Sequence, residues 1–275
     1  GFSQRLANQA DQLGGRHKEA LDHVVDNGNQ MLNLVSDLLD LSQVDAQSLT
    51  ISRAPVDLRE YMAKIDIISD PICPWCFIGK TRLDRALEAN PTHNFIIEWH
   101  PFQLNPTMPK KGMDRREYLE AKFGGQEEAV KVYSNIDKTA KESGISMNFG
   151  GIKRTPNTID AHRLIHWAGI EGKQNIIVDR LFKSYFQEGR DISEKSVLTR
   201  IASAAGMNQD VVRRLLESDA DVDDIMARDT DARKKGIQGV PAFVVANEYV
   251  VQGAQNTDVW DNIIKEIQEV TKFDG

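Results

Sequence analysis

The two cysteines of the chain, Cys73 and Cys76, lie within DPICPWCFIGK at residues 70–80. If Cys73 stands just before the first turn of a helix, its sulfur faces unpaired backbone N–H groups and the positive end of the helix dipole. Both favour the thiolate, which is the attacking species in disulfide exchange. Pro74 suits the first helical position, where an N–H would be unpaired in any case. Cys76 lies about one turn further on and can resolve the mixed disulfide that Cys73 forms, so the spacing predicts a two-electron redox pair.

Two simpler interpretations of the pair are reduced core cysteines and a zinc site. A zinc site needs four ligands, and the sequence has no second cysteine pair and no close histidine pair, so we expect no metal. Two cysteines cannot make a disulfide scaffold, and they suit a reducing compartment. The stretch MAKIDIISDP, which starts at Met62, has no signal-like apolar core. We therefore expect a cytoplasmic protein.

The composition is that of a globular protein, with 40% hydrophobic and 27% charged residues. Lys and Arg total 34 and Asp and Glu total 41, which gives a formal net charge of −7. This acidic balance argues against a nucleic-acid partner, because phosphate binding needs a basic surface. No apolar run approaches the roughly 20 residues of a membrane span, so we expect no membrane partner.

The elements that must position the thiols begin at Lys64, where KIDIIS reads as a buried strand. A helix from Cys76 to Ala89 follows, and about five or six helices fit between Met113 and Lys235. The other expected elements are strands at 94–103, 241–246 and 248–252 and an amphipathic helix at 257–270. This order predicts an α/β protein with a thioredoxin fold and an inserted helical domain at about 113–235. The thiols fall where the first strand feeds the first helix, a common place for chemistry in such sheets.

A second candidate element of the site is Pro241, in GIQGVPAFVV at 236–245. A thioredoxin fold places a cis-proline loop beside the thiols, and cis peptides are nearly confined to X–Pro bonds. The Val240–Pro241 bond is the candidate, and it would leave the backbone of Val240 free to pair with a bound peptide. The alternative is an ordinary proline that opens a strand. Trp75 is expected to be a half-exposed apolar contact for a substrate, or else a shield for the disulfide.

From Met62 onward the chain resembles the DsbA-family oxidoreductases of the FrnE type. The resemblance implies a thioredoxin fold with an inserted helical domain and a cytoplasmic thiol–disulfide oxidoreductase activity. Only Cys73, Cys76 and Pro241 carry over as functional residues. The stretches that match are DPICPWCFIGK, WHPFQLNP at 99–106, PNTIDAHRL at 156–164, LFKSYFQEGRDI at 181–192, GVPAFVV at 239–245 and GAQ at 253–255.

Two other functions are compatible with this fold. Glutathione-dependent isomerases, such as 2-hydroxychromene-2-carboxylate isomerase, and kappa-class glutathione transferases are similar, but the isomerases typically have serine at the first thiol position. Cys73 therefore points away from them. A non-catalytic binding or dimerisation module would require inert thiols. We expect an enzyme with no bound cofactor, with protein or small-molecule disulfides and thiols as partners and with glutathione as a conceivable redox partner.

Residues 1–61 resemble a different family, the sensor histidine kinases, from the middle of the dimerisation helices to the start of the ATP-binding domain. The phosphoacceptor motif is missing, because neither His17 nor His23 has the required neighbours. No kinase chemistry is expected. An apolar stripe at helical spacing predicts a helical hairpin that could form a homodimer, and a gene-junction remnant is the alternative. The stripe consists of Leu21, Val25, Leu32, Val35 and Leu39.

Several other polar residues of the matching stretches could in principle act in a site, but we expect them to be structural. They are His100, Asn105 and His162, of which His162 could border the cleft. Phe182, Tyr185 and Phe186 stand at helical spacing and are expected in the core.

Overall fold

The computed structural model describes residues 62–273, with the side chains of 270–273 left aside. The predictions for residues 1–61, namely the helical hairpin, its apolar stripe and a homodimer formed through it, lie outside the described residues. Within 62–273, each helix is too short or too polar to cross a membrane.

The central sheet has four strands in the order β2-β1-β5-β6. Strand β1 (Ala63–Ser69) is parallel to β2 (Phe95–Pro101) and antiparallel to β5 (Ala242–Val245). Strand β6 (Tyr249–Gln252) pairs antiparallel with β5 at the edge. Because β1 is a central strand, its Ile65 and Ile67 are buried, as its apolar run predicts.

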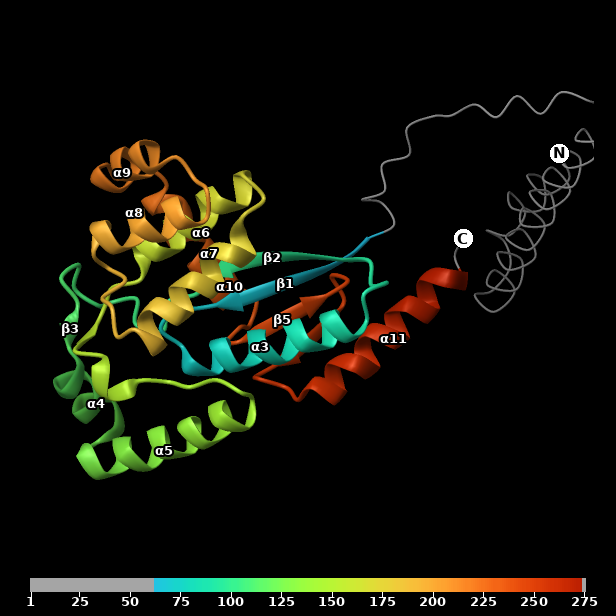
Figure 1. The fold of residues 1–275 in the computed structure, drawn as a ribbon, viewed down its shortest axis with the longest axis horizontal. Helices are drawn as coiled ribbons and strands as arrows, with labels where there is room; N and C mark the ends of the chain where they lie inside the picture. The colour runs from blue at the N-terminus through green and yellow to red at the C-terminus, as the bar shows by residue number, and fades with distance from the viewer. Residues whose placement is uncertain (1–61, 274–275) are drawn as a thin grey trace, which may run out of the picture. The chain divides into compact units, whose positions relative to one another are not determined.

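Helices α3 (Pro74–Ala89) and α11 (Thr257–Phe273) pack against each other beside this sheet (Figure 1). Trp260 anchors α11, because its fully buried ring meets Phe243 of β5 edge-on at 4.7 Å between centroids. The chain forms a strand, a helix, a strand, a helical insertion, a hairpin and a final helix. This is the order that the sequence predicts. The fold is therefore a thioredoxin-like α/β fold with an inserted helical domain.

The insertion between β2 and β5 is mostly helical. Its helix α10 packs against β2 and α6 and so returns the chain to the sheet. A short antiparallel pair, β3 (Met113–Asp114) with β4 (Arg154–Thr155), closes the other end of the insertion. The helices are α4 (Arg115–Phe123), α5 (Gln126–Glu142), α6 (Ile159–Ile170), α7 (Gln174–Phe182), α8 (Lys195–Ala204), α9 (Gln209–Glu217) and α10 (Val222–Lys234).

The set of helices and strands that the sequence predicts is wrong in detail. It has five or six helices for the insertion, where the structure has the seven helices α4 to α10. It omits β3 and β4, since two-residue strands have no periodicity to detect. The first helix begins at Pro74 rather than Cys76, and the second strand ends at Pro101 rather than at residue 103.

Aromatic rings connect α3 with the insertion. Phe77 stacks on Phe182 with 5.2 Å between ring centroids, and Phe186 lies 6.1 Å away on the same side. Phe182, Tyr185 and Phe186 are fully buried, which confirms the prediction that they belong to the core. The helix that starts at the thiols is therefore packed directly on the helical insertion.

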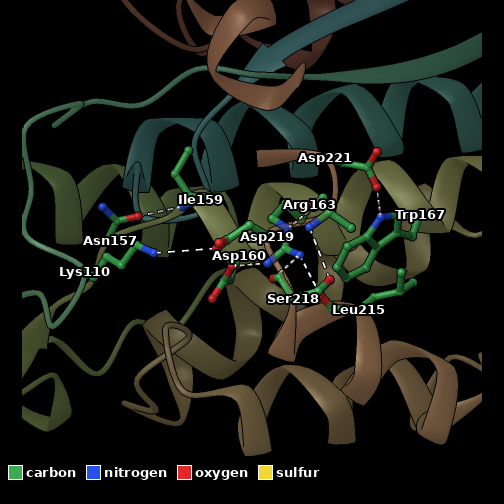
Figure 2. Close-up of polar contacts among 11 residues, drawn as sticks. Lys110, Asn157, Ile159, Asp160, Arg163, Trp167, Leu215, Ser218, Asp219 and Asp221 are labelled. Carbon is green, nitrogen blue, oxygen red and sulfur yellow. Dashed lines mark hydrogen bonds and ion pairs between the residues drawn. The ribbon is translucent and has the colours of Figure 1, made fainter. Parts of the chain in front are cut away.

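Arg163 holds another part of the insertion together (Figure 2). Its buried guanidinium donates to the carbonyl oxygens of Leu215, Ser218 and Ala220 at 2.6–2.9 Å and to Asp160 Oδ1 at 2.7 Å. The three carbonyl groups lie at the end of α9 and in the turn before α10, where helical carbonyl groups run out of partners within the helix. Arg163 thus joins α6 to the segment that leads back to the sheet.

Candidate active site

Cys73 is the N-cap residue of α3, with Pro74 at the first helical position. Its φ of −89° and ψ of 113° are extended, so the residue stands just outside the helix. Its carbonyl oxygen accepts from the N–H groups of Cys76 at 3.1 Å and of Phe77 at 3.3 Å. The structure therefore has Cys73 at a helix N-terminus and Cys76 within the first turn, the arrangement on which the redox interpretation depends.

Both cysteines are free thiols and both are buried, with 3% of Cys73 and 1% of Cys76 exposed. Burial raises the pKa of Cys76 well above its ordinary value, and the hydrogen bond and negative charge of Cys73 raise it further. Hydrogen bonds with Ser69 and with the backbone of Asp70 oppose that increase. Cys76 therefore holds its proton more tightly than a free thiol does, which suits it to act as the second thiol of the pair.

The loop before β5 lies against the thiols. The Cys73 Sγ donates to the carbonyl oxygen of Val240 at 3.5 Å, and the Val240–Pro241 peptide bond is cis. Pro241 is buried, whereas Val240 is half-buried. Trp75 is half-buried and packs against the core cluster that contains both cysteines. The structure thus brings together all five residues that the sequence singles out for the site.

Gly79, which the sequence analysis passes over, explains how this loop can approach α3 so closely. A Cβ at Gly79 would lie 3.1 Å from Cγ of Pro241 and 3.3 Å from Cζ of Phe243. Both distances are shorter than an ordinary van der Waals contact. A glycine inside a helix lowers stability by about 1 kcal/mol relative to alanine. A glycine in the middle of the predicted helix therefore indicates that another part of the chain packs closely at that position.

Asp70 is a second residue that the sequence analysis does not place in the site. It is fully buried, and its carboxylate accepts from Leu104 N at 2.7 Å and from Ile72 N at 3.3 Å. Its own carbonyl oxygen accepts from Cys73 N at 2.9 Å. Burial raises the pKa of Asp70 to about 7, against these hydrogen bonds. The residue therefore fixes the turn that carries the thiols and titrates near neutral pH.

His162 lies beside Asp70, with Nε2 at 3.9 Å from Oδ1. Burial lowers the pKa of His162 to about 4, so the two groups do not form an ion pair at neutral pH. Among the described residues, Nε2 has no hydrogen-bond partner. His162 is thus closer to the chemistry than the sequence analysis expects.

His100 and Asn105 take part in other contacts. The His100 ring joins Asp66 at 2.5 Å and Arg228 at 3.2 Å, and Asn105 accepts from Tyr118 OH at 3.0 Å. Asp66, Glu98 and His100 could together hold a metal ion, but Lys64 already bridges both carboxylates. This arrangement makes the cluster an ion-pair network on the sheet.

Comparisons with known proteins agree with this fold and geometry. Residues 64–265 match the model of the DSBA-like thioredoxin domain. The YwbO protein of Bacillus subtilis (strain 168) is 27% identical over 206 residues, which are 74% of this chain and 97% of YwbO.

Two solved structures share the fold. The crystal structure of probable DsbA oxidoreductase SCO1869 from Streptomyces coelicolor has a TM-score of 0.68 and 29% identity, over 75% of this chain and 90% of that one. The cytosolic disulfide reductase DsbM from Pseudomonas aeruginosa has a TM-score of 0.56 and 17% identity, over 75% and 99%. Since the family model covers more than half of the chain, the chain belongs to the DSBA-like thioredoxin domain family, a family of oxidoreductases.

Proposed function

We propose that the chain is a thiol–disulfide oxidoreductase of the FrnE type, with Cys73 and Cys76 as its redox pair and protein or small-molecule disulfides as substrates. The observation that carries the proposal is the position of Cys73 as the N-cap residue of α3, with Cys76 in the first turn and both as free thiols. The raised pKa of Cys76 supports the order of events, because it keeps the second thiol protonated until it is needed.

In the reducing direction, the Cys73 thiolate attacks one sulfur of a substrate disulfide R–S–S–R. A bond forms between Cys73 and that sulfur, the substrate S–S bond breaks, and the first R–S⁻ leaves. Cys76 then loses its proton and attacks Cys73, which forms the Cys73–Cys76 disulfide and releases the second R–S⁻. Two electrons pass from the dithiol to the substrate, and the reverse sequence oxidises a substrate dithiol.

The remaining site residues have binding roles in this proposal. The Val240 carbonyl, which accepts from the Cys73 thiol at 3.5 Å, would be released when that sulfur becomes part of a disulfide. The backbone beside Pro241 would then pair with an extended substrate. Trp75 is half-buried next to Cys73 and offers an apolar contact for the same substrate.

The proposal needs no bound cofactor, and glutathione enters it as a redox partner that resets the pair. The alternative, a glutathione-dependent isomerase or transferase, has no use for a resolving thiol, so Cys76 favours the redox function. We also propose a cytoplasmic location, where a dithiol of this kind would be kept reduced.

The decisive measurement is the equilibrium of the thiol pair against a series of glutathione redox buffers. We expect the native chain to exchange two electrons cooperatively. With a disulfide substrate, Cys73→Ser should abolish turnover, whereas Cys76→Ser should accumulate a mixed disulfide that mass spectrometry detects on Cys73. A Cys76→Ser chain that turns over the disulfide substrate at the native rate would contradict the role of Cys76 as the resolving thiol.

A further inference from the structure

Arg115 is a buried cation that has no carboxylate partner within residues 62–273. Only 8% of the residue is exposed, at the first position of α4. Its Nη1 donates to Tyr185 OH at 3.1 Å and to Thr155 Oγ1 at 3.4 Å, and its Nη2 donates to Tyr133 OH at 2.7 Å. A buried charge is normally paired with an opposite one. Arg115 is held in place by neutral hydroxyl groups instead, and the five donors of a guanidinium leave N–H groups over for an anion.

The acidic residues nearby are already engaged. Asp114 caps α4, since its carboxylate accepts from the backbone N–H groups of Arg116 and Glu117. Glu120 pairs with Arg116 at 2.8 Å. Lys153 adds another cation on the same wall. Asp114 and Glu120 also line the cavity, but both carboxylates are bound by other groups, so Arg115 has no carboxylate partner within residues 62–273.

Arg115 lines a cavity of about 410 Å³ between α4, α5 and the turn at Phe149. That volume lies within the range of about 300–1,000 Å³ for small-molecule sites. The charged lining consists of Arg115, Arg116 and Lys153 with Asp114 and Glu120. Because both carboxylates are already bound within the chain, the cavity suits a molecule with a carboxylate at one end and an apolar body. The apolar lining comes from Leu119, Ala129, Val130, Tyr133, Phe149 and Ile152.

Packed aromatic rings lie between the cavity and the helix that starts at the thiols, and Tyr133 lines the cavity. Phe77, the residue after Cys76, stacks on Phe186 with 6.1 Å between ring centroids. The Phe186 and Phe149 centroids are 6.3 Å apart, and those of Phe149 and Tyr133 are 4.8 Å apart. Burial raises the pKa of Tyr133, and the charge of Cys73 adds to the increase. Helix α5, which carries Tyr133, packs on α3, and Figure 1 shows it running alongside α3.

We propose that this cavity is a specificity subsite for small disulfides whose halves carry a carboxylate on an apolar body, with Arg115 as the group that binds the carboxylate. The inference rests on the proposed function, because the bound disulfide is the one that Cys73 attacks. Arg115 contributes binding only, and the electrons pass between sulfur atoms as described above. An arginine suits this role because its planar donors match a carboxylate in two-point contact.

The test compares two aromatic disulfides on the reduced full-length chain. One is 5,5′-dithiobis(2-nitrobenzoate), which has a carboxylate on each ring, and the other is the neutral 4,4′-dithiodipyridine. We expect Arg115→Met to slow the reaction with the carboxylate disulfide by about 10–100-fold, the worth of a charge-assisted hydrogen bond. The neutral disulfide should react at a nearly unchanged rate. Arg115→Lys should restore part of the loss.

Matched variants keep the test decisive. Lys131→Met removes an exposed cation of α5 that pairs with Glu128 and does not line the cavity, and it should leave both rates nearly unchanged. Val130→Glu places a negative charge on an exposed residue of the cavity, so it should fold even if Arg115→Met does not. It should slow only the carboxylate disulfide.

Two outcomes would overturn the subsite. One is an equal loss with both disulfides, which would mean that Arg115 acts on the fold or on Cys73. The other is equal binding of 2-nitrobenzoate and 2-nitrobenzamide to the native chain in a calorimetric titration, with no effect of Arg115→Met. If neither disulfide reacts with the native chain, the proposed function fails. The titration then decides alone whether the cavity selects carboxylates.

Discussion

Asp70 Oδ1 and His162 Nε2 lie 3.9 Å apart, and burial favours the uncharged form of each group. The pKa of Asp70 is raised to about 7 and that of His162 is lowered to about 4. His162 is therefore neutral around neutral pH, whereas Asp70 changes from uncharged to charged as the pH rises through about 7. The two groups impose opposite dependences of stability on pH.

The first prediction concerns Asp70. Its pKa is raised from 3.8 to about 7, so between these values the native chain keeps a proton that the unfolded chain has released. The resulting stability is complete below pH 3.8 and is lost as the pH rises through about 7. Asp70→Asn cannot titrate. Relative to the native chain, its free energy of unfolding should therefore increase by about 2–3 kcal/mol between about pH 5 and 8, at about 1.36 kcal/mol per pKa unit. Urea titrations at a series of pH values measure this difference.

The second prediction is the opposite behaviour of His162. Its pKa is lowered from 6.5 to about 4, so the unfolded chain takes up a proton before the native chain does. The stability from His162 is present above pH 6.5 and is lost as the pH falls through about 4. His162→Gln should weaken the acid-side loss of stability in the same urea titrations. Curves for the native chain and for both variants that run parallel across this range would show that neither group is perturbed.

The third prediction concerns Gly79, where two effects of a methyl group compete. Alanine favours the helix by about 1 kcal/mol, but a Cβ at 3.1 Å from Pro241 Cγ forces the loop away from α3, and overpacking costs about 1–3 kcal/mol. We expect Gly79→Ala to lose stability on balance and to slow disulfide reduction, because Val240 moves relative to Cys73.

Gly239 provides the matched control, since a Cβ there meets nothing within 4 Å although it lies in the same loop. Gly239→Ala should leave both the urea midpoint and the rate of disulfide reduction close to native. A Gly79→Ala chain that is more stable than native and equally active would mean that the loop has room to move.

The parts of the site that could be predicted are those that short stretches of sequence determine. Cys73, Pro74 and Cys76 are neighbours, and the chemistry of a helix start depends on adjacent residues, so the motif alone indicates where the thiols stand. The strand before them is an uninterrupted apolar run, which is typical of a central strand. The order of the other elements then indicates the fold.

The parts that could not be predicted depend on residues that meet only in the folded chain. Nothing near Asp70 in the sequence shows that His162 will bury it, and nothing near Arg115 indicates that Tyr133 and Tyr185 will surround its guanidinium. The perturbed pKa values arise from that burial. A glycine such as Gly79 can be recognised as unusual from the sequence, but its reason becomes visible only when Pro241 packs against it.

The last prediction concerns Arg163, whose side chain is 2% exposed and whose acceptors are backbone carbonyl oxygens and Asp160 (Figure 2). Arg163→Met keeps much of the apolar volume but removes a donor from four part-buried acceptors, of which Leu215 O keeps its bonds from Ser218. We expect a loss of about 1–3 kcal/mol in the free energy of unfolding, as for acceptors that lose a charged donor.

Lys110, which Figure 2 shows beside Asp219, provides the control. Its ion pair with Asp219, at 3.8 Å, is almost fully exposed. Lys110→Ala should therefore leave the urea midpoint unchanged. Because Arg163 binds the α9–α10 segment and not the thiols, the folded fraction of Arg163→Met should react with a disulfide at the native rate. Stability close to native in Arg163→Met would mean that water satisfies the three carbonyl groups. A folded Arg163→Met chain with unreactive thiols would instead mean that the position of α10, and with it the Val240 loop, depends on this one side chain.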